Sequence, residues 1–182
     1  MTFRKLIAGV AVLGITLGGT GAALAASAKR APNRATIKAV TNFKVKINRY
    51  IRDDLRWNKD VYFVRSGGTL HVVNAARGDG PHTFTVVRRK DLPTAAHVFD
   101  CKICETLGQA HGAPPNGEGP PKFQFLENGV GQDTPPDVDR PGDSAVVDEG
   151  KSVDLKVTAK KGATLRFMCL IHPWMQAKVL VR

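Results

Sequence analysis

A short segment near the C-terminus, CLIHPWM (169–175), combines three metal-ligating residue types at regular spacing. Cys169, His172 and Met175 follow one another at intervals of three residues, in a chain with only three Cys and three Met among 182 residues. Thiolate, neutral imidazole and thioether are soft to borderline ligands that suit copper. Each of these residues alone would be an ordinary core or turn residue. Their combination within seven residues predicts a metal-binding loop.

A second imidazole would complete a trigonal set of two His and one Cys, with the Met as a weak axial ligand. His82 is the candidate, because it stands where a Gly-Pro loop enters a β-branched run, HTFTVV (82–87). A His at the end of one strand can meet a loop between two other strands at the same end of a β-sandwich. The predicted metal ligands are therefore His82, Cys169, His172 and Met175.

Short alternating apolar and polar runs, separated by Gly turns, dominate the chain on both sides of position 120 and predict β-strands. The expected strands cover residues 43–47, 60–64, 69–74, 82–87, 152–158, 164–169 and 177–182. Cys169 ends one of them and Ala177 begins the next, so the ligands occupy the connecting loop. Helical periodicity is weak, and only residues 90–105 could hold a short helix. This pattern predicts an all-β sandwich or barrel.

A different kind of sequence separates the two groups of strands. It is rich in proline, in the stretches GAPPNGEGPP (112–121) and TPPDVDRPGD (134–143). Such a composition disfavours regular elements. Residues 88–145 are therefore expected to form a long, loop-rich insert within a single domain, residues 27–182. A loop of this length is usually functional or poorly ordered.

The N-terminal segment has the features of an export signal. Arg4 and Lys5 precede an apolar run that ends in small residues around Ala23–Ala25. This is the pattern of a cleaved secretory signal over residues 1–26, and it predicts a periplasmic or extracellular protein. An uncleaved membrane anchor is the alternative, because the run is about long enough to span a bilayer. Five Gly within it disfavour that alternative.

The charge balance is strongly basic, with 27 Lys and Arg against 16 Asp and Glu and a formal net charge of +11. Such a balance favours an acidic protein partner or an anionic surface. The basic residues are scattered rather than interleaved with aromatic residues, and an exported chain rarely meets nucleic acid. Nucleic-acid binding is therefore not expected.

The remaining two cysteines form a separate motif, Cys101-x-x-Cys104, flanked by His97 and His111. Haem attachment is excluded because Glu105 stands where a His is required. A binuclear copper centre would need two cysteines in the ligand loop, which has only one. A local disulfide is the ordinary expectation in an exported protein. A zinc or second copper site of two Cys and two His, and a free dithiol, are the alternatives.

Three stretches of the sequence resemble the cupredoxins, the small blue copper proteins. They are VRSGGTLHVVN (64–74), PHTF (81–84) and GATLRFMC (162–169) with its continuation to Val181. The resemblance spans about residues 58–88 and 148–182. The short Cys-x-x-His-x-x-Met loop looks most like the amicyanin type, whereas the plastocyanin and pseudoazurin types have a slightly longer His-to-Met spacing. The resemblance implies an all-β, cupredoxin-like Greek-key sandwich with a long loop-rich insert, holding one type 1 copper ion.

Position by position, the resemblance implies roles for the matching residues. His82 and His172 would supply nitrogens, Cys169 the thiolate and Met175 the axial sulfur. Thr83 matches a small polar residue that braces the ligand loop in the family. Two departures stand out: Met168 precedes the Cys where the family often has Tyr, and the insert has no counterpart in the minimal fold.

The function implied is a one-electron carrier between redox proteins, because four protein ligands leave no open position for a substrate and an enzyme is not expected. The partners would be redox proteins, with an acidic docking surface suited to a basic monomer. Electrons would pass through the edge of His172, with Pro173 and Trp174 beside it as an apolar docking patch or, for Trp174, as core. The alternative function is copper trafficking or storage on the same fold.

Overall fold

The computed structural model describes residues 30–114 and 119–182. The expected export signal, residues 1–26, lies outside the described residues. No helix within the described ranges has the length and apolar character needed to cross a membrane.

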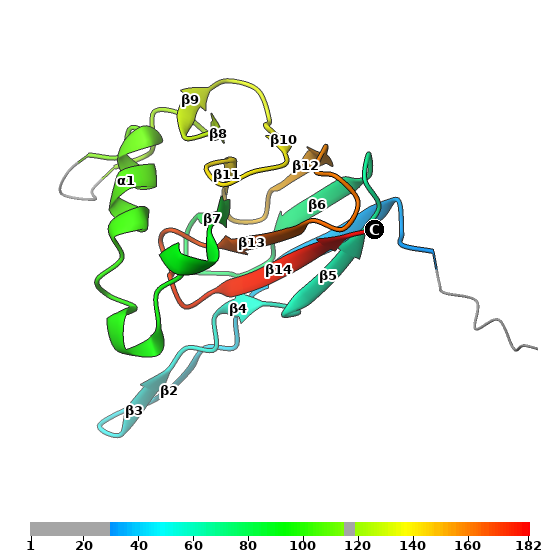
Figure 1. The fold of residues 1–182 in the computed structure, drawn as a ribbon. Helices are drawn as coiled ribbons and strands as arrows, with labels where there is room; N and C mark the ends of the chain where they lie inside the picture. Colours follow the sequence, from blue (N-terminus) through cyan, green and yellow to red (C-terminus); the bar gives the residue numbers. More distant parts are fainter. Residues whose placement is uncertain (1–29, 115–118) are drawn as a thin grey trace, which may run out of the picture.

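Strands make up most of the regular structure, with one α-helix between them (Figure 1). The elements in chain order are β1 (Arg34–Val40), β2 (Lys44–Lys46), β3 (Tyr50–Arg52), β4 (Arg56–Trp57), β5 (Val61–Val64), β6 (Thr69–Asn74), β7 (His82–Val87), 3₁₀ turns at Arg89–Asp91 and Ala95–His97, α1 (Lys102–Ala110), β8 (Phe125–Glu127), β9 (Val130–Gln132), β10 (Asp137–Val138), β11 (Ser144–Val147), β12 (Ser152–Val157), β13 (Thr164–Met168) and β14 (Gln176–Val181).

Two sheets face each other and a third, small sheet stands apart. The five-stranded sheet has the order β10-β12-β6-β1-β4, and the seven-stranded sheet the order β5-β14-β13-β7-β11-β8-β9. Neighbours in each sheet are mostly distant in sequence, and β1–β6 and β5–β14 pair in parallel. The all-β prediction is therefore confirmed.

Alternating burial explains how these sequences pair the sheets. In β1 every second residue, from Ala35 to Ala39, is buried while its neighbours are exposed, as expected for a strand with one face on the core. The core between the sheets contains a cluster of aromatic rings around Phe167. Its ring centroid lies 4.5 Å from that of Phe84 and 5.3 Å from that of Trp57. This core fixes β7 and β13 against each other.

All six residues of β7 are buried, as are the four residues of its neighbour β11. Phe84 and Val86 point into the main core, whereas Val87 belongs to a second cluster on the opposite face of the sheet. The second core consists of Val87, Cys101, Leu107, Leu126, Met168 and Leu170. It holds α1 against the outer face of β7, β13 and β8, which belong to the same sheet, on one side of the sandwich (Figure 1).

The insert is more regular than its composition predicts. The insert, residues 88–145, contains α1 and the strands β8 to β10, and its end begins β11. The proline-rich stretches were expected to disfavour regular elements, and the strands β8 to β10 contradict that expectation. The helix also lies later than expected, over Lys102–Ala110 instead of 90–105. Proline falls in the turns between these elements, while the apolar residues of the second core hold them in place.

The hairpin β2–β3 projects from the sandwich (Figure 1). Its residues pair only with each other, with Val45 opposite Ile51, and all are exposed. The chain returns from the hairpin through Leu55 and Trp57, which are buried in the main core. The hairpin is thereby rooted beside the loop between β13 and β14, as the hydrogen bonds described below show.

Candidate metal centre

Three donor atoms converge at one end of the sandwich. Nδ1 of His82 lies 3.1 Å from Nδ1 of His172, and Sγ of Cys169 lies 3.7 Å from each of these nitrogens. His82 and Cys169 are buried and His172 is partly exposed. In the described residues these three form the only group of His, Cys, Asp or Glu side chains arranged to hold a metal ion.

These separations fit a trigonal metal site. Protein metal bonds are about 2.0 Å to imidazole nitrogen and about 2.3 Å to thiolate sulfur, as zinc sites illustrate. An ion at those distances would make angles of about 120° between the sulfur and each nitrogen and about 100° between the two nitrogens. A soft thiolate with two imidazoles in a trigonal set is the donor combination of type 1 copper. The residues present therefore fit the copper ion that the sequence implies.

The protonation states of the two imidazoles suit them to act as ligands. Burial, reinforced by the charge of His172 nearby, lowers the pKa of His82 to about 4, although Asp53 acts in the opposite direction. Burial also lowers the pKa of His172, again against Asp53 and Asp79. Both rings are therefore neutral near pH 7, each with a lone pair free to bind a cation.

The thiol is protected rather than activated by its surroundings. Complete burial raises the pKa of Cys169, while hydrogen bonds from the backbone and from the Thr83 side chain act to lower it. The backbone N–H of Thr83 donates to Sγ of Cys169 over 3.3 Å. Without a cation the thiol stays protonated, and a metal that binds must displace its proton.

The ligand loop is closed on itself by backbone hydrogen bonds. The N–H of Cys169 donates to the carbonyl of Met175, and the N–H of Met175 to that of His172. Met175 is buried in the same core cluster as Cys169. The indole N–H of Trp57 also donates to the Met175 carbonyl, over 2.9 Å. The predicted axial ligand thus lies in a fixed loop beside the three converging atoms, and its bond to a metal stays a prediction.

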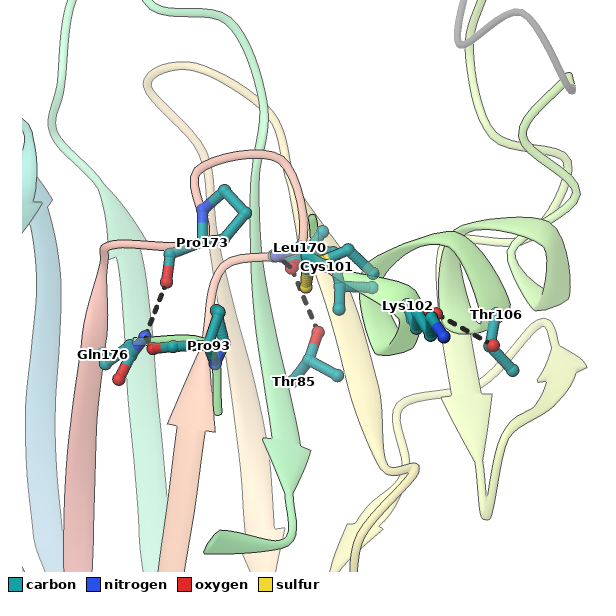
Figure 2. The surroundings of a disulfide bond; sticks show 10 residues. Thr85, Pro93, Cys101, Lys102, Thr106, Leu170, Pro173 and Gln176 are labelled. Carbon is teal, nitrogen blue, oxygen red and sulfur yellow. Dashed lines mark hydrogen bonds between the residues drawn. A yellow bond between two sulfur atoms is a disulfide. The ribbon is translucent and has the colours of Figure 1, made fainter. Parts of the chain in front are cut away.

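Side-chain hydrogen bonds tie the loop to three neighbouring segments. Thr83 accepts a hydrogen bond from the N–H of Leu170 over 2.7 Å, which places it as the expected brace. Trp174 donates to the carbonyl of Leu55, next to the root of the β2–β3 hairpin. The Gln176 amide donates to the carbonyls of Pro93 and Pro173, joining the insert to the loop (Figure 2).

Trp174 has an exposed edge as well as this anchor, so it is neither core nor free surface. It is 44% exposed, beside Ile171 at 48% and the ring of Phe99, which is 91% exposed. The ring centroids of Trp174 and His172 are 5.3 Å apart. An apolar surface therefore surrounds the one predicted ligand that reaches solvent.

The second cysteine motif forms a disulfide, Cys101–Cys104, at the start of α1. It lies beside Leu170 of the ligand loop, as Figure 2 shows. The alternatives, a zinc or second copper site and a free dithiol, are therefore not formed. His111 turns its two ring nitrogens to the Phe123 carbonyl and the Ser144 hydroxyl, and His97 lies in an exposed turn. His71 is a strand residue of β6 that contacts Asp154 at the surface.

Sequence reasoning missed the polar residues behind the site, Thr85, Ser144 and His111. One signal could have found them: Thr83 and Thr85 alternate with apolar residues in HTFTVV, so both hydroxyls share the face of β7 opposite the main core. Two hydroxyls on a strand that proves buried on both faces require partners from another segment.

Comparison with protein families found no matching family model, and no curated protein matches the chain. Solved structures with a similar fold include auracyanin from Roseiflexus castenholzii, with 15% sequence identity, 84% of this chain and 98% of that chain covered and a TM-score of 0.44. Another is an azurin from Methylomonas sp. strain J, with 10% identity, coverages of 82% and 97% and a TM-score of 0.43. A purple cupredoxin from Nitrosopumilus maritimus has 11% identity, coverages of 81% and 99% and a TM-score of 0.40.

These neighbours are cupredoxins, the family that the sequence resembles. Their similarity to this chain is one of fold. The assignment of a metal site rests on the separations of the His82, Cys169 and His172 donor atoms.

Proposed function

We propose that this protein is an exported one-electron carrier that holds a single type 1 copper ion through His82, Cys169, His172 and Met175. The observation that carries the proposal is the convergence of Sγ of Cys169 with two Nδ1 atoms at 3.1–3.7 Å. Copper bound there would supply a Cu(II)/Cu(I) couple. Export rests on the sequence of residues 1–26.

The protein contributes ligand atoms that are held rigidly and are mostly shielded from water. Cys169 and Met175 lie in a loop closed by backbone hydrogen bonds and by Trp57, so their positions need not change with the charge at the site. His82 and Cys169 are buried, which keeps water away from the thiolate. A closed set of protein ligands leaves no position for a substrate, so we infer a carrier and not an enzyme.

Electron exchange would occur at the partly exposed His172. The apolar surface of Ile171, Trp174 and Phe99 around it is suited to transient docking against another protein. The net charge of +11 favours a partner with an acidic surface, because opposite charges speed diffusional encounter. We infer that the carrier acts as a monomer in this exchange.

The test is an optical spectrum of the oxidised, copper-loaded protein, followed through repeated reduction and reoxidation in the presence of a copper chelator. A carrier should show the intense visible absorption of a copper–thiolate bond and retain its metal through the cycles. Loss of copper to the chelator after reduction would indicate trafficking or storage instead. Absence of the band in a protein shown to contain copper would refute the type 1 site.

A further inference from the structure

A chain of buried hydroxyls links the insert to the Cys169 sulfur. His111 Nε2 lies 2.9 Å from Ser144 Oγ, which lies 2.7 Å from Thr85 Oγ1. Thr85 Oγ1 lies 3.0 Å from Thr83 Oγ1, the atom that accepts the Leu170 N–H. The Thr83 side chain also acts to lower the pKa of the Cys169 thiol, in contact with the sulfur whose other Thr83 partner is the backbone N–H. All four side chains are buried, so their only described partners are one another and the groups at the two ends.

His111 stands at the end of this hydrogen-bonded series that is farthest from Cys169, and the insert holds it in place. His111 caps the C-terminus of α1, and its Nδ1 lies 2.8 Å from the carbonyl oxygen of Phe123. The disulfide at Cys101 and the apolar residues of the second core fix the same helix against β7 and β13. The imidazole therefore has a fixed position and orientation.

His111 competes with Thr85 for the single hydroxyl hydrogen of Ser144. A carbonyl only accepts, so Nδ1 of His111 carries the ring hydrogen and Nε2 of the neutral ring is an acceptor. Burial lowers the pKa of His111 and so favours this neutral ring. Ser144 has a single hydroxyl hydrogen and two acceptors, His111 Nε2 and Thr85 Oγ1.

The acceptor to which Ser144 donates its hydrogen determines the direction of the next hydrogen bonds in the series. If Ser144 donates to Thr85, then Thr85 donates to Thr83, whose own hydrogen is left for the sulfur. In the structure Thr85 donates to Thr83. If Ser144 donates to His111, Thr85 can turn its hydrogen to Ser144 instead, and Thr83 then turns its own hydrogen to Thr85. The sulfur then loses its hydroxyl donor, although it keeps the Thr83 N–H.

We propose that His111 is a positioning residue for the Cys169 sulfur: through Ser144, Thr85 and Thr83 it competes with that sulfur for hydroxyl hydrogens and thereby tunes the site. The part of this inference that concerns copper rests on the proposed function. Hydrogen bonds to a thiolate ligand withdraw electron density from it, which disfavours Cu(II) relative to Cu(I) and raises the reduction potential.

The experiment compares reduction potentials of copper-loaded variants. His111→Leu removes the competing acceptor and should raise the potential, whereas Thr83→Val removes the donor and should lower it. We expect changes of about threefold to tenfold in the relative affinity for the two oxidation states, or about 30–60 mV in each direction. The double variant Thr83→Val with His111→Leu should match Thr83→Val alone, because the link between them is cut.

Ser144→Ala leaves His111 in place against the Phe123 carbonyl. It should shift the reduction potential in the same direction as His111→Leu, so the proposal can still be tested if His111→Leu folds poorly. Ser66→Ala is the matched control. Like Ser144→Ala, it removes one serine hydroxyl. This hydroxyl donates to the carbonyl of Ala159, away from the ligand loop. Ser66→Ala should leave the potential unchanged. Unchanged potentials in His111→Leu and Ser144→Ala, or additive effects in the double variant, would overturn the proposal.

A second readout uses the metal-free protein. The amide proton of Leu170 donates to Thr83 Oγ1, so its NMR chemical shift should move in His111→Leu and Ser144→Ala but not in Ser66→Ala. If the amide responds while no variant shows copper–thiolate absorption, the hydroxyl chain stands and the proposed function fails. If the copper band is present while neither the amide nor the potential responds, the role of His111 is refuted.

Discussion

Nδ1 of His82 and Nδ1 of His172 lie 3.1 Å apart although 90 positions separate them in the sequence. Antiparallel pairing of β7 with β13 brings the two segments together, with Met168 opposite Thr85. β7 begins at His82 and β13 ends at Met168, so both lead to the same end of the sheet. The nearness of the two imidazoles is therefore a consequence of strand register.

The two kinds of cysteine should separate cleanly by spectroscopy. Cys169→Ala removes the predicted thiolate ligand, so the visible absorption of the copper-loaded protein should vanish. Cys101→Ala combined with Cys104→Ala removes the disulfide but no predicted ligand, and the band should persist. Bleaching in the paired variant, with the protein folded, would show that the division between structural and ligating cysteines is wrong.

Removing that disulfide should lower stability modestly. Closing a loop of four residues contributes about 2 kcal/mol in the chain-entropy description. We expect the free energy of unfolding to fall by about this amount in Cys101→Ala with Cys104→Ala, measured by urea denaturation of the metal-free protein. An equal loss in the wild-type protein after reduction with dithiothreitol would identify the disulfide, and not the substituted side chains, as the cause.

Gln176 should stabilise the junction between the insert and the ligand loop. Gln176→Ala loses hydrogen bonds to the carbonyls of Pro93 and Pro173, each contributing about 0.5–1.5 kcal/mol. Its free energy of unfolding should therefore fall by about 1–3 kcal/mol. Gln132→Ala, which breaks one exposed hydrogen bond to the Thr134 carbonyl, is the control and should change stability little. Equal effects in the two variants would contradict the special role of the junction.

Acid should destabilise the metal-free protein. Burial lowers the pKa of His82 to about 4 and also lowers that of His111, so the unfolded chain binds more protons than the folded one below the ordinary His pKa of about 6.5. Stability should be constant above that pH and fall as pH drops from about 6.5 towards 4. Urea midpoints at pH 7.5 and pH 5 measure this, and His111→Gln should weaken the dependence. A pH-independent midpoint over this range would contradict the shifts.

The strands around the site were predictable because they are short runs rich in β-branched and aromatic residues. β6 and β7 have the predicted bounds, and the loop from Cys169 to Ala177 was correctly placed between two strands. The spacing of ligand types identified which side chains would meet. To predict that the ligand side chains meet, it was enough to know that they lie at the ends of strands.

The rest of the fold depends on tertiary contacts that no local pattern reveals. β1, which is not among the predicted strands, alternates polar and apolar residues from Arg34 to Ala39 and pairs with β6. The insert folds because Leu107 and Leu126 pack with Met168 and Leu170 in the second core, on the outer face of the sheet. His111 was considered as a possible ligand beside the cysteines, but the helix points it into the sheet instead.

The cover that the insert places over β7 has a consequence for attempts to shorten this protein. A chain trimmed to the usual small sandwich, without residues 88–143, would expose to water Val87 and the hydroxyls of Thr83 and Thr85 behind the thiolate. Water would then compete for the hydrogen of Thr83 and reach the back of the ligand loop. In this protein, unlike a minimal sandwich, the wall behind the sulfur is supplied by a segment that contributes none of its predicted ligands.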